Sequence, residues 1–342
     1  MKQNNFNFLR FYFAFIVVIG HLIEISYFKP FLKLSPYFST YISVTGFFCI
    51  SGFLISRSYL NTPNLKDYLK KRAARLLPAY VFIIFSCALF LSFLSKYSIS
   101  EYFTNPLLYK YLAANLTFLN FIQPCLPGVF TNNAASCAVN GALWTLKIEV
   151  SFYLIIPVLL YLTKKIRLKQ LLFIGIYLMS VLYRNFFEYL SNLPGIEYYS
   201  IIARQLPGFM SYFVCGIALN YYFEFFIQNK KTLVLFGLLI FILERILGIE
   251  FLTPLALSVI VFFVAFSFKR LNNFAKHGDI SYGIYIFHYP IMKIASEFGY
   301  FEKYNPVVVS ITIVLLVLFV GYASWHLIEK RFLKITHSTR VE

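Results

Sequence analysis

Apolar residues in this 342-residue chain occur in repeated blocks, each close to the length of a membrane-crossing helix. About 20 consecutive apolar residues cross a bilayer as a helix, which satisfies its backbone hydrogen bonds internally. Of all residues 59% are hydrophobic and 13% are charged, whereas soluble domains usually carry about 25% charged residues. The sequence therefore predicts an all-α polytopic membrane protein with about ten transmembrane helices, near residues 6–28, 37–60, 76–96, 141–163, 171–187, 201–223, 232–248, 252–268, 279–297 and 306–327.

The formal charge of +17 would suit nucleic-acid binding, but the positions of the basic residues argue against it. Lys and Arg gather in every second gap between the apolar blocks, as in the segments 66–75 and 164–169, and the other gaps are poorer in them. This is the positive-inside pattern, in which basic loops stay in the cytoplasm. We therefore expect both termini to be cytoplasmic and nucleic acid not to be a partner.

The segment from about 97 to 140 is the only long gap on the predicted outer side. It contains Cys125 and Cys137, which can form a disulfide if the segment faces an oxidising compartment, although spacing alone does not show pairing. The five cysteines fit no metal-ligand spacing. With no internal repeat and no cleavage site after the first block, we expect a single membrane domain, 1–342, without an appended soluble domain.

The first predicted helix carries ionisable side chains that are costly in a bilayer. Arg10 and His21 are eleven residues apart, which is three helical turns plus about 20°, so both lie on one face. A lone His on an apolar helix is more often a satisfied structural residue than a catalyst, yet imidazole can accept a hydroxyl proton near neutral pH. Glu24, one turn further on, can orient the imidazole or favour its charged form, and the sequence leaves both interpretations open.

Small and basic residues surround the second gap. Ser51 and Gly52 stand in the second predicted helix, where small residues allow close helix packing or the close approach of a ligand. Arg72 and Arg75, at i and i+3 before the third helix, share a face and match phosphate geometry. Ordinary basic anchoring at the membrane surface explains the same pair.

Two later helices also carry polar side chains on one face. Thr145 and Glu149 are at i and i+4 in the fourth predicted helix, where the carboxylate needs a partner. Tyr285 and His288 share a face in the ninth, and Pro290 is expected to kink that helix beside them. A polar stripe in an apolar helix indicates a cavity between helices.

In this order, these motifs resemble the acyltransferase 3 family over nearly the whole chain. The elements that carry the resemblance are Arg10-x10-His21, Phe47-Phe48-x-x-Ser51-Gly52, Arg72-x-x-Arg75 before Pro78, Trp144-Thr145-Leu146-x-x-Glu149 and Ser281-Tyr282-Gly283-x-Tyr285-x-x-His288. Many members have Asp at Asn7, Gly at Phe11 and Ser at Thr145, so the chain departs from the family pattern at these three positions.

The resemblance implies a multi-pass O-acyltransferase of the bacterial inner membrane. It would take acetyl, or another short acyl group, from cytoplasmic acyl-CoA to a hydroxyl of a surface glycan or lipid-linked glycan, without a metal. His21 would either deprotonate that hydroxyl or carry the acyl group as an acyl-imidazole, and both routes stay open. The expected site residues are catalytic His21, Glu24 and Glu149; acyl-CoA-binding Arg10, Arg72, Arg75 and Ser51; and, in the substrate pocket, Trp144, Tyr285 and His288.

Two other classes of membrane protein also fit many helices with buried charges. A transporter or glycan flippase would often show inverted repeats and broken helix pairs, neither of which the sequence displays clearly. A glycan polymerase would change the chain length of the product rather than its acetyl content.

Overall fold

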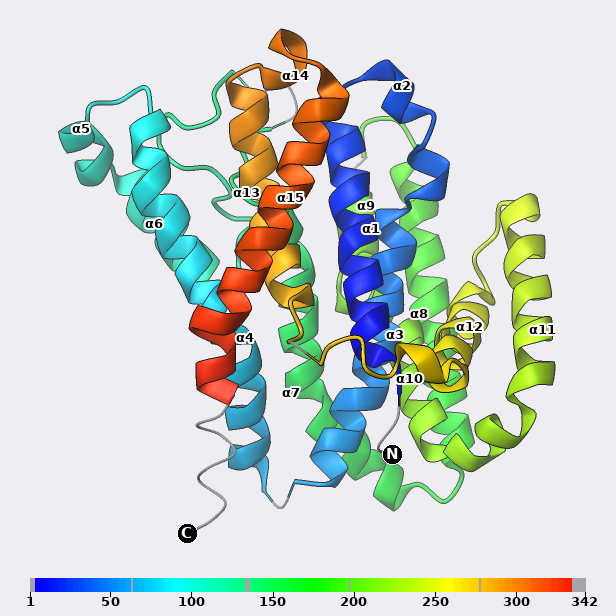
Figure 1. Ribbon diagram of the computed structural model, residues 1–342. Helices are drawn as coiled ribbons and strands as arrows, with labels where there is room; N and C mark the ends of the chain where they lie inside the picture. The colour runs from blue at the N-terminus through cyan, green and yellow to red at the C-terminus, as the bar shows by residue number, and fades with distance from the viewer. Residues whose placement is uncertain (1–3, 63, 133–135, 197, 277, 334–342) are drawn as a thin grey trace. The chain divides into compact units, whose positions relative to one another are not determined.

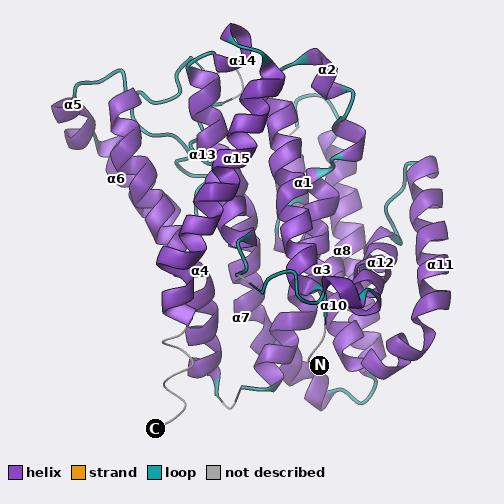
Figure 2. Cartoon of the chain, viewed as in Figure 1, coloured by secondary structure: helices purple, strands orange, loops and turns teal. Residues whose placement is uncertain are grey.

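The computed structural model describes residues 4–333 apart from 63, 133–135, 197 and 277, and within these residues the regular structure is helical, without strands (Figures 1 and 2). The α-helices are α1 Phe6–Ser26, α2 Lys29–Leu32, α3 Thr40–Leu60, α4 Leu65–Phe90, α5 Ile99–Thr104, α6 Pro106–Leu116, α7 Trp144–Lys165, α8 Lys169–Ser191, α9 Tyr199–Ala203, α10 Leu206–Tyr221, α11 Phe223–Leu247, α12 Thr253–Ser267, α13 Ser281–Glu297, α14 Tyr300–Lys303 and α15 Pro306–Ser324. A π-helical turn, Trp325–Glu329, continues α15.

Eight helical segments in the described part of the chain are long and apolar enough to cross a membrane. The two remaining predicted spans, 252–268 and 279–297, correspond to α12 and α13, which have 15 and 17 residues. The prediction of an all-α polytopic membrane protein is therefore confirmed. The cytoplasmic location of both termini stays a prediction.

Helix boundaries differ from the predicted ones where a helix and its apolar block do not begin or end at the same residue. α4 begins at Leu65 rather than near 76, because the basic segment before the apolar block consists largely of good helix formers. The predicted span 201–223 is two helices, α9 and α10, and Pro207 stands in the first turn of α10. Proline is accommodated there because the first turn of a helix has no partner for its N–H groups.

The chain divides into two compact units, and each is described by itself. Unit 1 comprises Met1–Arg10, Tyr41–Leu69 and Ile148–Ala275, and unit 2 comprises Phe11–Thr40, Lys70–Lys147 and Lys276–Glu342.

Unit 1 is held together by backbone-to-backbone contact between α3 and α10. A Cβ atom at Gly52 would lie 2.0 Å from the carbonyl oxygen of Phe213, and one at Gly216 would lie 2.1 Å from that of Cys49. Gly52 thus serves close packing, and the ligand role of Ser51 stays a prediction. Beside this core, α11 lies against α12 (Figure 1) and exposes a row of large apolar side chains suited to lipid: Leu235, Phe236, Leu239, Ile242 and Ile246.

Unit 2 is built around α13 and α15, which lie side by side and are joined through α14 (Figure 1). Gly283 and Gly321 allow this approach, since a Cβ at Gly283 would lie 2.9 Å from the Cα of Gly321. Tyr282 Oη also donates to the carbonyl of Leu76 at 2.9 Å, which ties α13 to α4. These contacts fix the helix that carries the polar stripe.

The long segment between α4 and α7 is also part of unit 2, and it is partly helical. Tyr102 Oη donates to the carbonyl of Ala88 at 2.8 Å, and Tyr80 Oη donates to that of Asn115 at 2.7 Å. These bonds pack α5 and α6 against α4. Cys125 and Cys137, whose pairing the sequence left open, form a disulfide.

Candidate functional site

Two histidines from opposite ends of the chain meet within unit 2. His21 Nδ1 on α1 is 2.8 Å from His288 Nε2 on α13, although 267 residues separate them in the sequence. The two rings are nearly parallel, with an angle of 8° between their planes. His288 is 0% exposed, whereas His21 is partly exposed. Of the pair, His21 is therefore the ring that a substrate can reach.

Aromatic and hydroxyl groups hold this histidine pair in place. The ring of Tyr289 meets the ring of His21 edge to face, with centroids 5.4 Å apart. Tyr285 Oη and Thr145 Oγ1 are 2.6 Å apart, so one donates to the other, and the carbonyl oxygen of Ala142 lies 3.3 Å and 3.2 Å from them and can accept from the remaining hydroxyl. The start of α7 is thereby fixed against α13, one turn before His288.

A proline in α13 creates a second anchor. Pro290 has no N–H to donate to the carbonyl of Ile286, the residue four positions earlier. Asn140 Nδ2 donates to that carbonyl instead, at 2.8 Å, and Asn140 Oδ1 accepts from the N–H of Ala142. One side chain thus replaces the missing helical donor and caps the short 3₁₀ turn Gly141–Leu143 before α7. Asn140 was not among the expected site residues, although Pro290 in an apolar helix indicated a carbonyl in need of a donor.

A second pair of expected site residues lies in unit 1. Ser51 Oγ on α3 donates to Glu149 Oε1 on α7 at 3.0 Å. Both side chains are partly exposed. Ser51 is therefore one partner of the Glu149 carboxylate, which the sequence predicted to need one.

Arg75 lies in a cluster of carboxylates in unit 2 that we call the Arg75 cluster, with Asp279, Glu329, Ser281 and Ser324. Arg75 Nη2 donates to Asp279 Oδ2 at 2.5 Å, and Nη1 is 3.7 Å from Glu329 Oε2. Ser281 Oγ donates to Asp279 Oδ1 at 2.5 Å, and Ser324 Oγ donates to Glu329 Oε1 at 3.0 Å. The guanidinium expected to meet a phosphate thus faces two protein carboxylates.

Neither carboxylate of this cluster was among the expected site residues. Asp279 lies two residues before the first residue of α13, and its Oδ1 accepts from the N–H of Ser281 at 3.3 Å. Glu329 is 2% exposed although it stands next to Lys330 and Arg331. The available signal was an acidic residue inside a predicted cytoplasmic basic segment.

The other expected site residues lie on α1, α4 and α7. Arg10 on α1 belongs to unit 1 and is partly exposed, and Arg72 lies one turn before Arg75 on α4 and is also partly exposed. Glu24 lies on α1 and is exposed. Trp144 is the first residue of α7 and is partly exposed.

Two buried cations within the predicted spans were also not among the expected site residues. Arg184 on α8 is 0% exposed, donates to the carbonyl of Glu250 at 2.8 Å and lies over the ring of Tyr212. Lys293 on α13 is also fully buried and donates to the carbonyl of Ser136. Both have protein partners, which is the expected arrangement for a charge inside a membrane domain.

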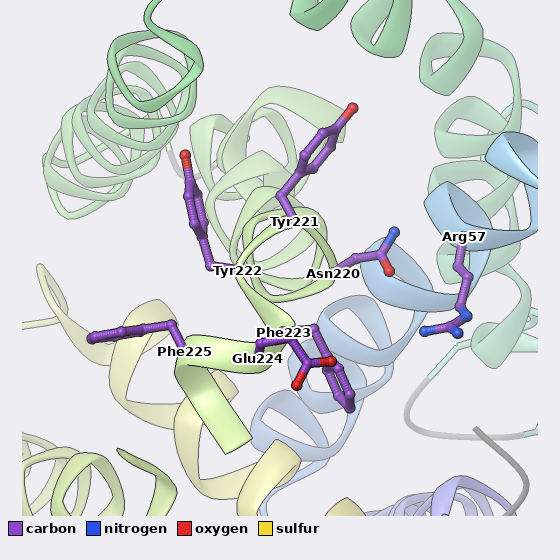
Figure 3. A pocket seen from close by; sticks show the side chains of 7 residues that line it. All are labelled: Arg57, Asn220, Tyr221, Tyr222, Phe223, Glu224 and Phe225. Carbon is purple, nitrogen blue, oxygen red and sulfur yellow. The ribbon is translucent and has the colours of Figure 1, made fainter. Parts of the chain in front are cut away.

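Unit 1 also has a cavity of about 610 Å³ at the junction of α10 and α11 (Figure 3). Arg57 comes from α3, and the other lining side chains come from the end of α10 and the start of α11. Its lining residues are Arg57, Asn220, Tyr221, Tyr222, Phe223, Glu224 and Phe225.

Among the residues the structure describes, no group of three His, Cys, Asp or Glu is arranged to hold a metal ion.

Comparisons with known proteins agree over most of the chain. A family model described as an acyltransferase domain, that of acyltransferase 3, matches residues 3–326. An O-acetyl transferase of Shigella phage Sf6 is 26% identical over 346 residues, covering 97% of this chain and 96% of that protein. Nodulation protein 10 of Rhizobium leguminosarum bv. viciae is 29% identical over 164 residues, 46% of this chain and 44% of that protein. No solved structure matches.

Proposed function

Because this chain belongs to the acyltransferase 3 family, we propose that its acyltransferase activity moves acetyl from cytoplasmic acetyl-CoA to a hydroxyl of a cell-surface glycan. The protein is a multi-pass membrane acyltransferase, and we place it in the bacterial inner membrane. The observation that carries the proposal is the histidine pair, with a partly exposed His21 backed by a buried His288.

His21 is the general base in this reaction. It takes the proton of the acceptor hydroxyl, and the acceptor oxygen attacks the thioester carbonyl carbon. The bond between that carbon and the sulfur of coenzyme A then breaks, and the departing thiolate takes the proton from His21. The products are an ester and free coenzyme A, with no metal and no change of oxidation state.

Two features support acetyl as the group transferred and oxygen as its acceptor. The phage relative that matches nearly the whole chain is named an O-acetyl transferase. The ordered motifs also resemble a family whose members commonly O-acetylate surface polysaccharides. A glycan or lipid-linked glycan, with many hydroxyls, is the acceptor class we assign.

Arg72 is the cation we assign to the phosphates of acetyl-CoA. A guanidinium pairs with phosphate through two parallel hydrogen bonds, which makes Arg the usual choice for this contact. Arg75 faces Asp279 and Glu329, and we assign it to the stability of the fold instead. This assignment narrows the earlier expectation that both Arg72 and Arg75 bind the donor.

The function is tested in the host by complementing a deletion strain and measuring the O-acetyl content of its purified surface polysaccharide by NMR. We expect the wild-type gene to restore acetylation and His21→Gln to fail at an equal protein level. The matched control is His326→Gln, since His326 lies in the π-helical turn and contacts Tyr322 rather than the histidine pair. Acetylation restored by His21→Gln would contradict the proposal, and a change in chain length alone would indicate a polymerase.

A further inference from the structure

The histidine pair continues into a chain of hydrogen bonds whose direction is fixed at one end. His288 Nδ1 is 3.3 Å from the carbonyl oxygen of Ile284, one turn earlier on α13. His288 Nε2 is 2.8 Å from His21 Nδ1. The chain therefore runs from a backbone carbonyl through both imidazole rings.

A carbonyl oxygen can only accept a hydrogen bond, so the bond to Ile284 requires the proton of neutral His288 to be on Nδ1. His288 Nε2 then has a lone pair and accepts from the Nδ1–H of His21. The remaining nitrogen of neutral His21, Nε2, is left unprotonated. Each step follows from the one before, because a neutral imidazole has one donor and one acceptor nitrogen.

We propose that His288 is a positioning residue that holds His21 in the tautomer whose Nε2 can take the acceptor's proton. The inference rests on the proposed function, since it concerns how His21 is prepared for that step. It also replaces the expectation that His288 lines the substrate pocket, because a side chain that is 0% exposed does not reach a substrate.

The same bond serves after His21 has taken the proton. The imidazolium of His21 still donates from Nδ1 to His288 Nε2, so the new charge keeps its acceptor without any movement of the rings. This follows the general pattern of a base oriented by a third group, with a neutral imidazole in the place often taken by a carboxylate. A neutral partner fixes the tautomer and adds no charge to a site inside the membrane domain.

The structure around His288 gives its ring little freedom. Tyr285 is tied to Thr145 one turn before it, and the carbonyl of Ile286 is bound by Asn140. The ring of Tyr289 packs against both histidines, with centroids 5.4 Å from His21 and 6.2 Å from His288. His288 is thus fixed from its own helix and from the start of α7.

The direct test is the ¹⁵N NMR spectrum of the purified full chain in lipid nanodiscs, with ¹⁵N-labelled histidine and His21 assigned through His21→Gln. We expect neutral wild-type His21 to carry its proton on Nδ1. His288→Leu removes the acceptor and should give a mixture of tautomers, whereas Tyr289→Phe, the matched control, should keep the wild-type tautomer. A wild-type His21 protonated on Nε2, or one unchanged by His288→Leu, overturns the inference.

The kinetic test uses radiolabelled acetyl-CoA with a crude envelope fraction of the deletion strain as acceptor. We expect His288→Leu to lower kcat roughly 10- to 100-fold, less than the roughly 10⁴-fold loss when a charged partner is removed from a catalytic triad. The KM for acetyl-CoA should stay unchanged. Should His288→Leu fail to fold, His288→Gln, whose amide oxygen can accept from His21 Nδ1, should retain most of the activity. A change in KM with kcat unaltered would overturn the positioning role.

The two proposals fail in different ways. The tautomer of wild-type His21 is measured without any substrate, so it decides the role of His288 alone. If that tautomer is as expected but His21→Gln still acetylates the glycan, the proposed function is wrong and the hydrogen-bond chain is not.

Discussion

Two polar clusters in unit 2 both involve α13, and they differ in whether they leave a side-chain group available for a reaction. The histidine pair consists of two imidazole rings in contact, of which His21 is partly exposed. The Arg75 cluster is charged, and its guanidinium and both carboxylates contact one another or the adjacent serines. The comparison separates a group prepared for chemistry from groups that are occupied with holding helices together.

The difference follows from the cost of burying charge. An isolated charge inside a membrane domain is expensive, so an Arg there needs carboxylate partners, and those partners then depend on the Arg. The Arg75 cluster joins α4, the segment before α13 and the end of α15 in this way. A neutral imidazole pair needs no counter-charge, which leaves one ring nitrogen for a reaction.

The largest expected effect is on the reaction itself. His21→Ala should lower the rate of acetyl transfer roughly 10²- to 10⁴-fold, the usual contribution of a general base, and should lower the free energy of unfolding by no more than the about 1–3 kcal/mol of one unsatisfied buried acceptor, His288 Nε2. The rate is measured with radiolabelled acetyl-CoA and envelope acceptor, and His326→Ala is the control. A large fall in stability in His21→Ala would mean that the histidine pair is structural.

The next effect concerns the Arg75 cluster. Arg75→Gln leaves the carboxylates of Asp279 and Glu329 without their cation, and we expect it to lower the free energy of unfolding by about 3 kcal/mol. Lys70→Gln, which removes an exposed cation from the same helix, should change it little. Denaturation of the purified proteins in detergent measures both. Unaltered stability in Arg75→Gln would show that the Arg75 cluster does not stabilise the fold.

Asn140 tests whether a contact beside the histidine pair can itself be structural. Asn140→Ala removes the donor to the Ile286 carbonyl, which Pro290 cannot replace, and an unsatisfied buried acceptor costs about 1–3 kcal/mol. The same denaturation experiment measures the loss, with the exposed Asn192→Ala as control. No difference between the two variants would show that this carbonyl finds another donor.

The smallest expected effect separates two neighbouring arginines. Arg72→Gln should weaken the binding of acetyl-CoA roughly tenfold, which corresponds to about 1.4 kcal/mol, because it removes a charge-assisted contact to phosphate. Arg75→Gln should leave that affinity unchanged in the folded protein. Calorimetric titration with acetyl-CoA measures both. Weaker binding of acetyl-CoA by Arg75→Gln, with unchanged binding by Arg72→Gln, would assign the phosphate contact to Arg75 instead.

Much of the fold was predictable because hydropathy and helix length have a direct physical link. The helix boundaries were less predictable, since α4 and α11 extend beyond their apolar blocks. His21 and His288 were identified by their positions on helix faces, but their pairing was not, because no local pattern relates residues 267 positions apart. Glu329 was missed because a carboxylate next to Lys330 and Arg331 looks like a solvated surface, and Asp279 was missed because it stands at the very start of its predicted span.

The most direct test of the account compares His21→Gln and Arg75→Gln side by side, measuring both the unfolding temperature and the acetyl transferred per folded molecule. We predict that His21→Gln keeps the wild-type unfolding temperature and loses transfer, while Arg75→Gln unfolds at a lower temperature and keeps transfer per folded molecule. The reverse pattern, with a stable but inactive Arg75→Gln and an active His21→Gln, would contradict the assignment of chemistry to the histidine pair.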